Sequence, residues 1–492
     1  MRFLTAVAVV CGLFFSNFLP VVAESSQLVW PKAFKPAFLN VNLVRNINLE
    51  KAYIRETINV VVQNIEKQPQ RDYFLPFPSD VVPNIGGLEV RDKNGPEKGR
   101  LRLELSEIDP SSNTQFYVIH LPEPLAPSSQ ITLSISYYIL SALHPLPKAI
   151  RQDDRQFLTY SFSAYALSAY TTVDQKTKIK FPSVNVPDYT VTSGLKSGSD
   201  PEKQGSTYTY GPYSNIAPRK FYPLNVRFAA SYPVLVCSLL ERDVEISHWG
   251  GNLAVEERYW LRNSGASLSD HFDRVSWMMK ASPSSAPLRV LKYPMKPGSV
   301  DPYFTDDIGN VSTSNYRPGR SGREAHLELR PRYPVFGGWQ YSFRVGWNNA
   351  LSSFLRKSSS ETFVLKVPFL EGPQNPEGIQ YEKFVLRIIL PEGSKNVRYE
   401  IIESVNNGLP NTVQIKSNIS KHRTFMDTVG RTVLSLSVEN LTDAARDSQL
   451  VVTYDFPFVE TLRKPLTISS GLLAVFVTAW VVSKLDVSIR KR

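Results

Sequence analysis

The sequence predicts a mainly β fold with two tandem, related antiparallel β-sheet domains of sandwich-like form, followed by one C-terminal transmembrane helix. Runs of alternating or β-branched residues recur along the chain, and clusters of Pro, Gly, Asn, Asp and Ser separate them, as in antiparallel sheets. Helical periodicity is scarce, with Ser269–Lys280 the best candidate. Two apolar segments bracket the chain, one at each end.

The N-terminal apolar segment predicts a signal peptide over residues 1–23. Arg2 precedes the apolar run Leu4–Phe15, and the small residue Ala23 closes an ending that signal peptidase accepts. The run is too short and wrongly flanked for a membrane span. We therefore expect cleavage after Ala23, with an uncleaved N-terminal anchor as the alternative.

The region between the apolar segments predicts two domains, residues 24–238 and 239–460. Two strand-plus-proline endings, at 225–233 and 450–457, resemble each other. Residues 176–182 likewise resemble residues 362–368. Each pair lies near the same relative place in its half, which favours a duplicated module with its boundary near Val236–Leu240. Chance similarity of such endings is the alternative.

The C-terminal apolar segment predicts a transmembrane helix over residues 465–483. Its seventeen uncharged residues, Leu466 to Val482, would extend roughly 25 Å at the ~1.5 Å rise of a helix. That length suits the endoplasmic reticulum bilayer, about 27 Å thick, better than the thicker plasma membrane. More basic residues follow the segment than precede it. We expect a single-pass type I protein of the endoplasmic reticulum membrane, with its large domain in the lumen and residues 484–492 in the cytosol.

Small residues recur every four positions along this helix. Ser470, Ala474 and Thr478 would lie on one helix face and form a narrow stripe. In lipid, such stripes allow two helix backbones to approach closely. We expect this face to pack against a membrane helix of a partner.

Composition excludes several classes of protein. The formal net charge of +11 includes Arg2 and six basic residues around and after the C-terminal apolar segment, so the rest carries a thin positive excess. A nucleic-acid partner is not expected. Cys11 lies in the predicted signal peptide, so Cys237 stands alone afterwards and no internal disulfide forms. We expect Cys237 to be a small buried core residue.

Motifs for common enzyme chemistry are absent from the sequence: it has no HExxH, CxxC, GxSxG, Walker A or dinucleotide fingerprint. His271 with Asp273 and Asp306 with Asp307 are the nearest to paired sites, and we expect surface turns at both. We therefore predict no catalytic residue, metal or cofactor, although glycosidase carboxylates would leave no linear trace.

Three Asn-x-Ser/Thr sequons predict N-glycosylation on the lumenal side. The acceptor residues are Asn310, Asn418 and Asn440, and none of the three sequons has proline at its middle position. The alternative for each is a buried or unreached sequon.

The aromatic-rich stretch Arg330–Trp347 is a candidate contact surface. The Gly337-Gly338 pair permits a tight backbone turn, with Phe336, Trp339 and Trp347 around it. These residues either rim a contact surface or pack as core aromatics about the turn.

Several blocks of this sequence carry a family resemblance. Residues Ile246–Gly251, Tyr303–Ser314 and Arg330–Trp347, together with Tyr53–Ile58 near the mature start, resemble the ribophorin I family in content and order. The blocks are long and aromatic-rich, and the similarity covers essentially the whole chain. One departure is that animal members carry a long cytosolic extension, whereas this chain stops at Arg492 and resembles the fungal form.

The resemblance implies an accessory, non-catalytic subunit of the oligosaccharyltransferase complex. That complex transfers a preassembled glycan from dolichyl pyrophosphate to Asn in Asn-x-Ser/Thr of nascent polypeptides. In the family, the catalytic residues and the metal belong to a different, polytopic subunit, so no catalytic residue carries over. The implied partners are other subunits of the complex, membrane lipid and, in a role in acceptor presentation, nascent polypeptides.

Two other classes remain open from the residues. A free-standing type I lumenal chaperone or cargo receptor would also be mainly β. A lumenal carbohydrate-active enzyme is the second. Co-purification with polytopic partners distinguishes a subunit from a receptor, and turnover of a glycan would indicate an enzyme.

Overall fold

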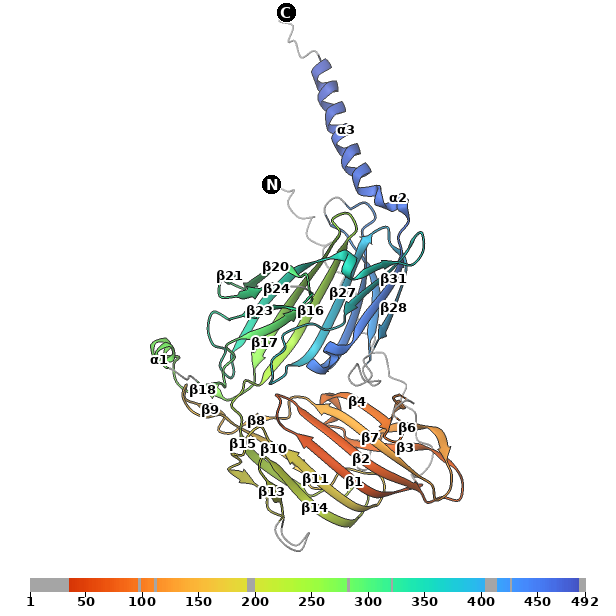
Figure 1. Ribbon diagram of the computed structural model, residues 1–492, viewed down its shortest axis with the longest axis vertical. Helices are drawn as coiled ribbons and strands as arrows, with labels where there is room; N and C mark the ends of the chain where they lie inside the picture. Colours follow the sequence, from red (N-terminus) through yellow and green to blue (C-terminus); the bar gives the residue numbers. More distant parts are fainter. Residues whose placement is uncertain are drawn as a thin grey trace, which may run out of the picture.

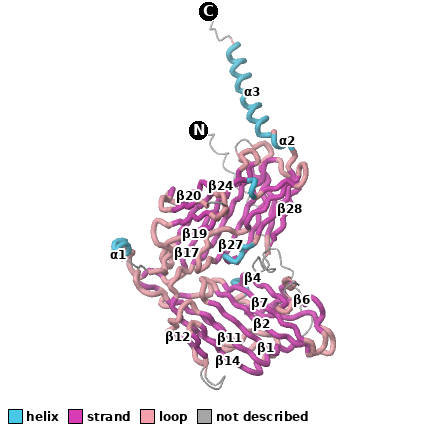
Figure 2. Tube along the Cα trace, in the orientation of Figure 1, coloured by secondary structure: helices cyan, strands magenta, loops and turns pink. Residues whose placement is uncertain are grey.

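The computed structural model of the chain describes residues 35–95, 99–109, 113–192, 200–280, 284–319, 322–402, 414–424 and 427–485. Two β-rich halves are stacked along the long axis, and a single long helix leaves the second half on the side away from the first (Figure 1). Strands dominate both halves (Figure 2). The prediction of a mainly β fold with one C-terminal apolar helix is confirmed. The expected signal peptide, residues 1–23, lies outside the described residues.

The first half is built on a seven-stranded sheet around β1 (Phe38–Asn48) and β2 (Ile54–Asn64). β1 pairs antiparallel with β2 on one side and parallel with β11 on the other. Alternate residues of β2 are buried, so one face of the sheet is covered. The sheet order is β13 (Glu202–Gln204), β14 (Thr207–Ile216), β11 (Thr172–Lys180), β1, β2, β7 (Gln130–Ile139), β4 (Ile85–Asp92).

Two smaller sheets lie on the covered face of this sheet. Leu75 and Ile119 of one small sheet share an apolar cluster with Ile58 of β2, and Phe162 and Phe228 of the other share a second cluster with residues of β11 and β14. The small sheets are β3 (Gln70–Pro78), β6 (Thr114–Leu125), β5 (Arg102–Asp109), and β12 (Asp188–Tyr189), β15 (Pro223–Ala229), β10 (Phe157–Ser163), β8 (His144–Pro145).

The second half repeats this plan on an eight-stranded sheet. The sheet order is β21 (Gly309–Asn310), β20 (Val300–Asp306), β24 (Gln340–Ala350), β17 (Asn252–Asn263), β16 (Leu235–Ser247), β27 (Gln380–Glu392), β30 (Arg431–Thr442), β29 (Lys416–His422). Its small sheets are β19 (Leu291–Met295), β23 (Ala325–Leu329), β22 (Asn315–Arg317), and β25 (Leu355–Lys357), β26 (Thr362–Pro368), β31 (Gln449–Asp455), β28 (Lys395–Ile402).

The central strand orders of the two halves correspond. β14-β11-β1-β2-β7-β4 in the first half matches β30-β27-β16-β17-β24-β20 in the second, and β16 pairs parallel with β27 as β1 does with β11. The 225–233 and 450–457 endings fall at β15 and β31, and each of these is an interior strand of a four-stranded sheet. The pairing of 176–182 with 362–368 is wrong, because β11 belongs to a large sheet and β26 to a small one.

The expected boundary after residue 238 also falls inside an element. Leu235 already pairs with Asn263 and Val236 with Gln380, so β16 enters the second sheet from its first residue. The apolar run around Cys237 is compatible with either the last strand of one domain or the first strand of the next. Only the strand pairing of β16 shows that it belongs to the second half.

Short strands connect the two halves, and short helices complete the fold. β9 (Ala149–Ile150) of the first half pairs parallel with β18 (Ser267–Leu268) of the second. The helix expected over 269–280 is shorter, because the Asp273 side chain accepts hydrogen bonds from Val275 N and Ser276 N and starts the helix there. The remaining elements are α1 (Arg274–Met279), η1 (Val82–Asn84), η3 (Leu351–Ser353), η4 (Asp443–Asp447), α2 (Phe458–Thr461) and α3 (Arg463–Lys484).

Each half buries an arginine–glutamate ion pair on the covered face of its large sheet. In the first, Arg45 Nε and Nη2 donate to Glu56 at 2.9 and 2.8 Å, and Tyr137 and Tyr160 donate their hydroxyls to the same carboxylate. Every oxygen of Glu56 is thereby satisfied, which offsets the cost of burying the charge.

The second half places Arg242 and Glu257 in the same strands of its own sheet, β16 and β17. Arg242 Nη1 donates to Glu257 at 2.5 Å and Nη2 to Glu371 at 2.5 Å, while Tyr259 donates to Glu257 at 2.7 Å. Sequence analysis missed both pairs. The available signal was a charged residue at an inward position of an otherwise apolar, alternating strand.

Candidate functional site

Helix α3 is the element of the described chain that is long and apolar enough to cross a membrane. Its residues are predominantly apolar, and its apolar stretch is not buried against the other described residues. Twenty-two residues extend about 33 Å as a helix. Uniform exposure of an apolar helix leaves it without a packing partner among the residues that the structure describes.

Three contacts fix the start of α3 to the second half. Trp249, in the turn between β16 and β17, donates its indole N–H to Thr461 O at 3.0 Å. Arg463 Nη1 donates to Thr428 Oγ1 at 3.2 Å, and Lys464 Nζ pairs with Asp427 at 3.2 Å. The helix is therefore attached at several points and not through a single flexible linker.

The carboxylates of Glu392 and Asp427 hold the loop before β30, close to the start of α3. Burial would raise the pKa of Glu392, but the N–H groups of Val429, Thr428 and Gly430 donate to its Oε1 and hold the pKa below its usual range. Burial opposes ionisation of Asp427 too, and hydrogen bonds from Thr424 and Lys464 lower its pKa overall. Both groups stay charged at neutral pH.

The predicted small-residue stripe lies on the exposed surface of α3. Thr478 Oγ1 donates to Ala474 O at 2.7 Å, and Ser470 Oγ donates to Thr467 O at 2.9 Å. These hydroxyls are satisfied within the helix, so the stripe presents small side chains whose hydroxyl donors are paired.

The two halves meet through polar contacts. Asp443 of η4 accepts a hydrogen bond from Tyr53 at 2.5 Å and an ion pair from Lys51 at 2.7 Å. Gln380 donates to Ala52 O and accepts from Ser141 N, each at 2.7 Å. The joint between the halves thus depends on side chains that reach across it to both side-chain and main-chain atoms.

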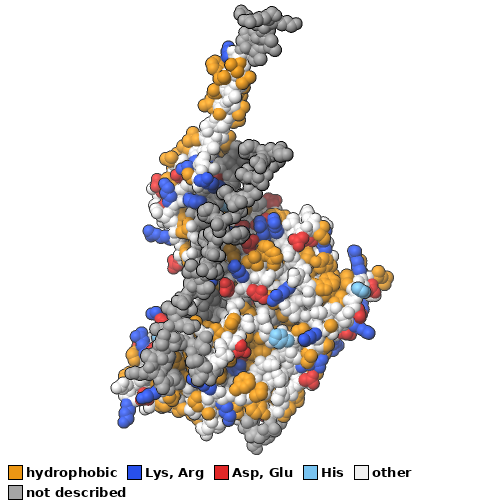
Figure 3. Space-filling model, turned by 180° about the vertical axis from the view of Figure 1, so that it is seen from behind, with side chains coloured by type: hydrophobic (Ala, Val, Ile, Leu, Met, Phe, Trp, Pro, Cys, Tyr) orange, Lys and Arg blue, Asp and Glu red, His pale blue; other side chains and the backbone are white. Residues whose placement is uncertain are grey.

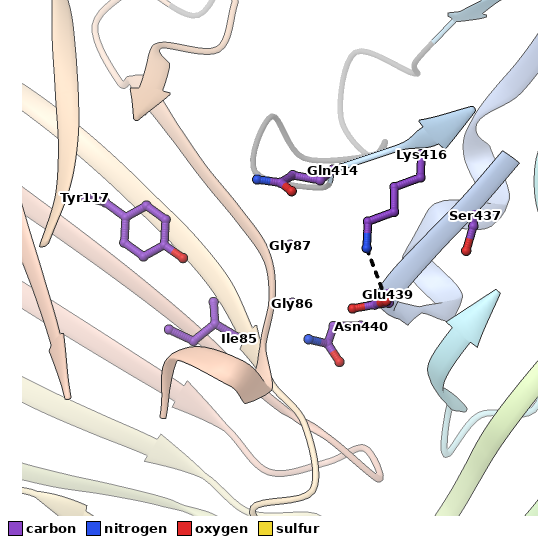
Figure 4. A pocket seen from close by; sticks show the side chains of 9 residues that line it. All are labelled: Ile85, Gly86, Gly87, Tyr117, Gln414, Lys416, Ser437, Glu439 and Asn440. Atoms are coloured by element: carbon purple, nitrogen blue, oxygen red, sulfur yellow. Dashed lines mark ion pairs between the residues drawn. The ribbon is translucent and has the colours of Figure 1, made fainter. Parts of the chain in front are cut away.

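A pocket of about 190 Å³ opens at this joint (Figure 4). Gly86 and Tyr117 of the first half face Glu439 and Asn440 of the second, and Lys416 pairs with Glu439 at 3.8 Å. Asn440 adopts a left-handed backbone with a φ of 56°, and its side-chain amide donates to Pro83 O at 2.7 Å. The pocket is small and bordered by both halves.

A larger pocket of about 520 Å³ lies in the first half between β3 and β10. Its walls are mostly apolar and aromatic, with Phe77, Tyr165 and Phe221 among them, and the Arg45–Glu56 pair lies at its floor. Phe221 is 63% exposed at this site. A volume in this range accepts a small ligand or a few side chains.

Comparison with known sequences identifies the family. The family profile described as Ribophorin I matches residues 38–483. The chain belongs to the ribophorin I family.

Individual relatives extend over nearly the whole chain. Subunit 1B of dolichyl-diphosphooligosaccharide–protein glycosyltransferase from Arabidopsis thaliana is 31% identical, over 92% of this chain and 94% of that protein. The corresponding subunit 1 of Schizosaccharomyces pombe is 28% identical over 90% and 94%. Subunit 1 of Caenorhabditis elegans is 30% identical over 92% and 73%. Native yeast LTA4 hydrolase, a solved structure, has a TM-score of 0.27 at 12% identity over 40% of this chain and 30% of that chain.

The three sequons of this ribophorin I family member lie in different surroundings. Asn310, at the end of the short strand β21, is exposed, and so is Asn418 on β29 at the edge of the large sheet. Asn440 is half-buried at the joint with its amide hydrogen-bonded. The sequons are therefore not equivalent once the chain is folded.

The aromatic stretch lies mainly in the core, which is the second of the two alternatives given for it. Phe336 is 5% and Trp347 2% exposed, and a Cβ added to Gly337 would lie 2.0 Å from Ala266 O. Trp339 is half-buried, with its ring centroid 5.4 Å from that of Phe336. The glycine pair serves close packing against the segment after β17.

The remaining candidates are structural. Asp306 pairs with Arg332 at 2.5 Å and accepts from Ile308 N in a turn, and Asp273 caps α1. Cys237 is fully buried, and burial raises the pKa of its thiol. No group of His, Cys, Asp and Glu within the described ranges could hold a metal ion.

Proposed function

We propose that this chain acts as a non-catalytic subunit 1 of the oligosaccharyltransferase, in which it supports assembly of the complex. Family membership over residues 38–483 carries this proposal, because the relatives bear that subunit name. A lipid-linked donor would need several helices to hold it at the membrane, and the described residues include one candidate span. The reaction itself would then belong to a polytopic partner.

The proposed location is the endoplasmic reticulum membrane, with both β halves in the lumen and α3 crossing once. The exposed apolar surface of α3 and its fixed attachment to the second half support this arrangement. Protease added to sealed microsomes should remove only the few residues beyond α3. Digestion of the β halves from outside would overturn the topology.

Co-purification in a mild, non-denaturing detergent tests the subunit role. A subunit should bring polytopic membrane proteins with it in fixed proportion. A free-standing chaperone or cargo receptor would run alone, and that outcome would overturn the proposal.

A second proposed role, acceptor presentation, rests on the 520 Å³ pocket. Its apolar and aromatic walls suit side chains of an unfolded polypeptide. A photo-crosslinking phenylalanine analogue at Phe221 should capture nascent chains during translation. The same analogue at Val184, 72% exposed and outside the pocket lining, serves as the control. Equal capture at both positions would contradict the role.

A further inference from the structure

Apolar side chains surround the point where α3 leaves the second half. Trp249 is 67%, Val429 43%, Phe458 73% and Val459 75% exposed. They come from the β16–β17 turn, the loop before β30, and α2. Exposed apolar residues are ordinary when scattered, but these four gather around one point. Hydrophobic side chains are visible at the foot of α3 and along it (Figure 3).

Hydrogen bonds fix the segments that carry these four residues. The Trp249 indole N–H donates a hydrogen bond to the main-chain oxygen of Thr461, the last residue of α2. Arg463 Nη1 donates to Thr428 Oγ1 at 3.2 Å, and Val429 N donates to Glu392 at 2.7 Å. The three segments therefore keep fixed positions relative to the start of α3.

Continuity with α3 identifies what covers this surface. If α3 crosses the bilayer from Arg463 onward, α2 lies within about one helical turn of its boundary. Tryptophan and other amphipathic rings are enriched at that depth. The nearby cations are already paired, Arg463 with Glu460 and Lys464 with Asp427, so binding would not require anionic lipid.

We propose that Trp249, Val429, Phe458 and Val459 form a lipid-contacting surface on which the second half rests against the lumenal leaflet. The contact would hold the stacked halves at a fixed angle to the membrane, because α3 alone leaves tilt free. This inference rests on the membrane crossing proposed above.

Depth measurement with single nitroxide labels tests the surface. The Cys237→Ala background receives Phe458→Cys or Val459→Cys in the intact complex, reconstituted in phosphatidylcholine nanodiscs. Power saturation compares collisions with lipid-soluble oxygen and with a water-soluble nickel chelate. Both labels should favour oxygen several-fold more than a label at Val184→Cys, an exposed position in the first half.

A label at Leu473→Cys in α3 separates this inference from the crossing itself. If Leu473 favours oxygen but Phe458 and Val459 favour nickel, the crossing stands and the lipid-contacting surface is wrong. If both positions of α2 are shielded from both reagents, a protein partner covers the surface and the inference is also wrong. If Leu473 favours nickel, α3 does not cross and the proposed location fails with it.

Discussion

The side-chain amide of Asn440 donates a hydrogen bond to the main-chain oxygen of Pro83, 2.7 Å away, across the contact between the two halves. The backbone is equally close at this point, because a Cβ added to Gly86 would lie 2.6 Å from Asn440 O. A glycan on the Asn440 amide nitrogen would remove one of its two N–H groups and occupy the joint. The folded structure is thus poorly compatible with modification at this sequon.

We predict that Asn310 and Asn418 carry N-glycans and Asn440 does not. Both favoured acceptors are exposed, whereas Asn440 is half-buried. Asn310→Gln and Asn418→Gln should each increase electrophoretic mobility by one glycan, and Asn440→Gln should leave it unchanged. Glycopeptide mass spectrometry checks the same point, and a modified Asn440 in the mature protein would contradict the prediction.

Removing one partner of the buried Arg242–Glu257 ion pair should strongly destabilise the second half. Glu257→Gln leaves Arg242, 1% exposed, with only Glu371 to balance its charge. The expected loss is about 3–5 kcal/mol of unfolding free energy. Glu382→Gln breaks the half-exposed pair with Arg262 and should cost less than ~1 kcal/mol. Thermal denaturation compares the two, and equal losses would contradict the assignment.

His248 should make stability depend on pH. Burial among Phe363, Tyr454 and Phe456 lowers the pKa of His248. The unfolded residue, with a pKa of about 6.5, then binds more protons than the folded one, so stability is complete above that pH and declines as pH falls below it. The melting temperature should decline from pH 7 to pH 5.5.

Substitution of His248 tests whether this residue causes the pH dependence of stability. His248→Asn removes the titrating group, so the decline should become shallower even if the variant is less stable at pH 7. His271→Asn at an exposed position should keep the parent profile. Identical pH profiles for all three proteins would exclude His248 as the cause.

The stripe on α3 should contribute to assembly. Ala474→Leu together with Ser470→Leu keeps the helix apolar but blocks close backbone approach. We expect reduced co-purification of partner subunits relative to a Leu473→Ile control on the neighbouring face. Equal recovery from both variants would place assembly on the β halves alone.

Cys237 should be dispensable for covalent structure. It is the one cysteine of the described residues and is fully buried. Cys237→Ala should cost on the order of 1 kcal/mol through a small cavity. A non-reducing gel should show the same mobility for both proteins, and a Cys237-dependent shift would reveal an intermolecular disulfide.

Local pattern was enough for the fold class and for the terminal helix. Alternation along segments such as Tyr53–Val62 predicts strands because side chains on a strand alternate between two faces. The uncharged run Leu466–Val482 predicts α3 because a membrane-spanning helix requires a long, apolar stretch, and both properties can be read directly from the sequence. The burial of Cys237 was also predictable, since the three residues before it, Val234–Val236, are all apolar.

Contacts between distant residues had to come from the tertiary structure. The sequence alone determined a mainly β protein with a C-terminal apolar helix, because both depend on periodicity over a few residues. Which half β16 joins, that Phe336 and Trp347 are core, and that Asn440 lies at a joint all depend on strand pairing and packing between segments far apart in the chain. A sequon or an aromatic stretch has the same local sequence whether it is exposed or buried, so its surroundings were decided only when the halves folded and met.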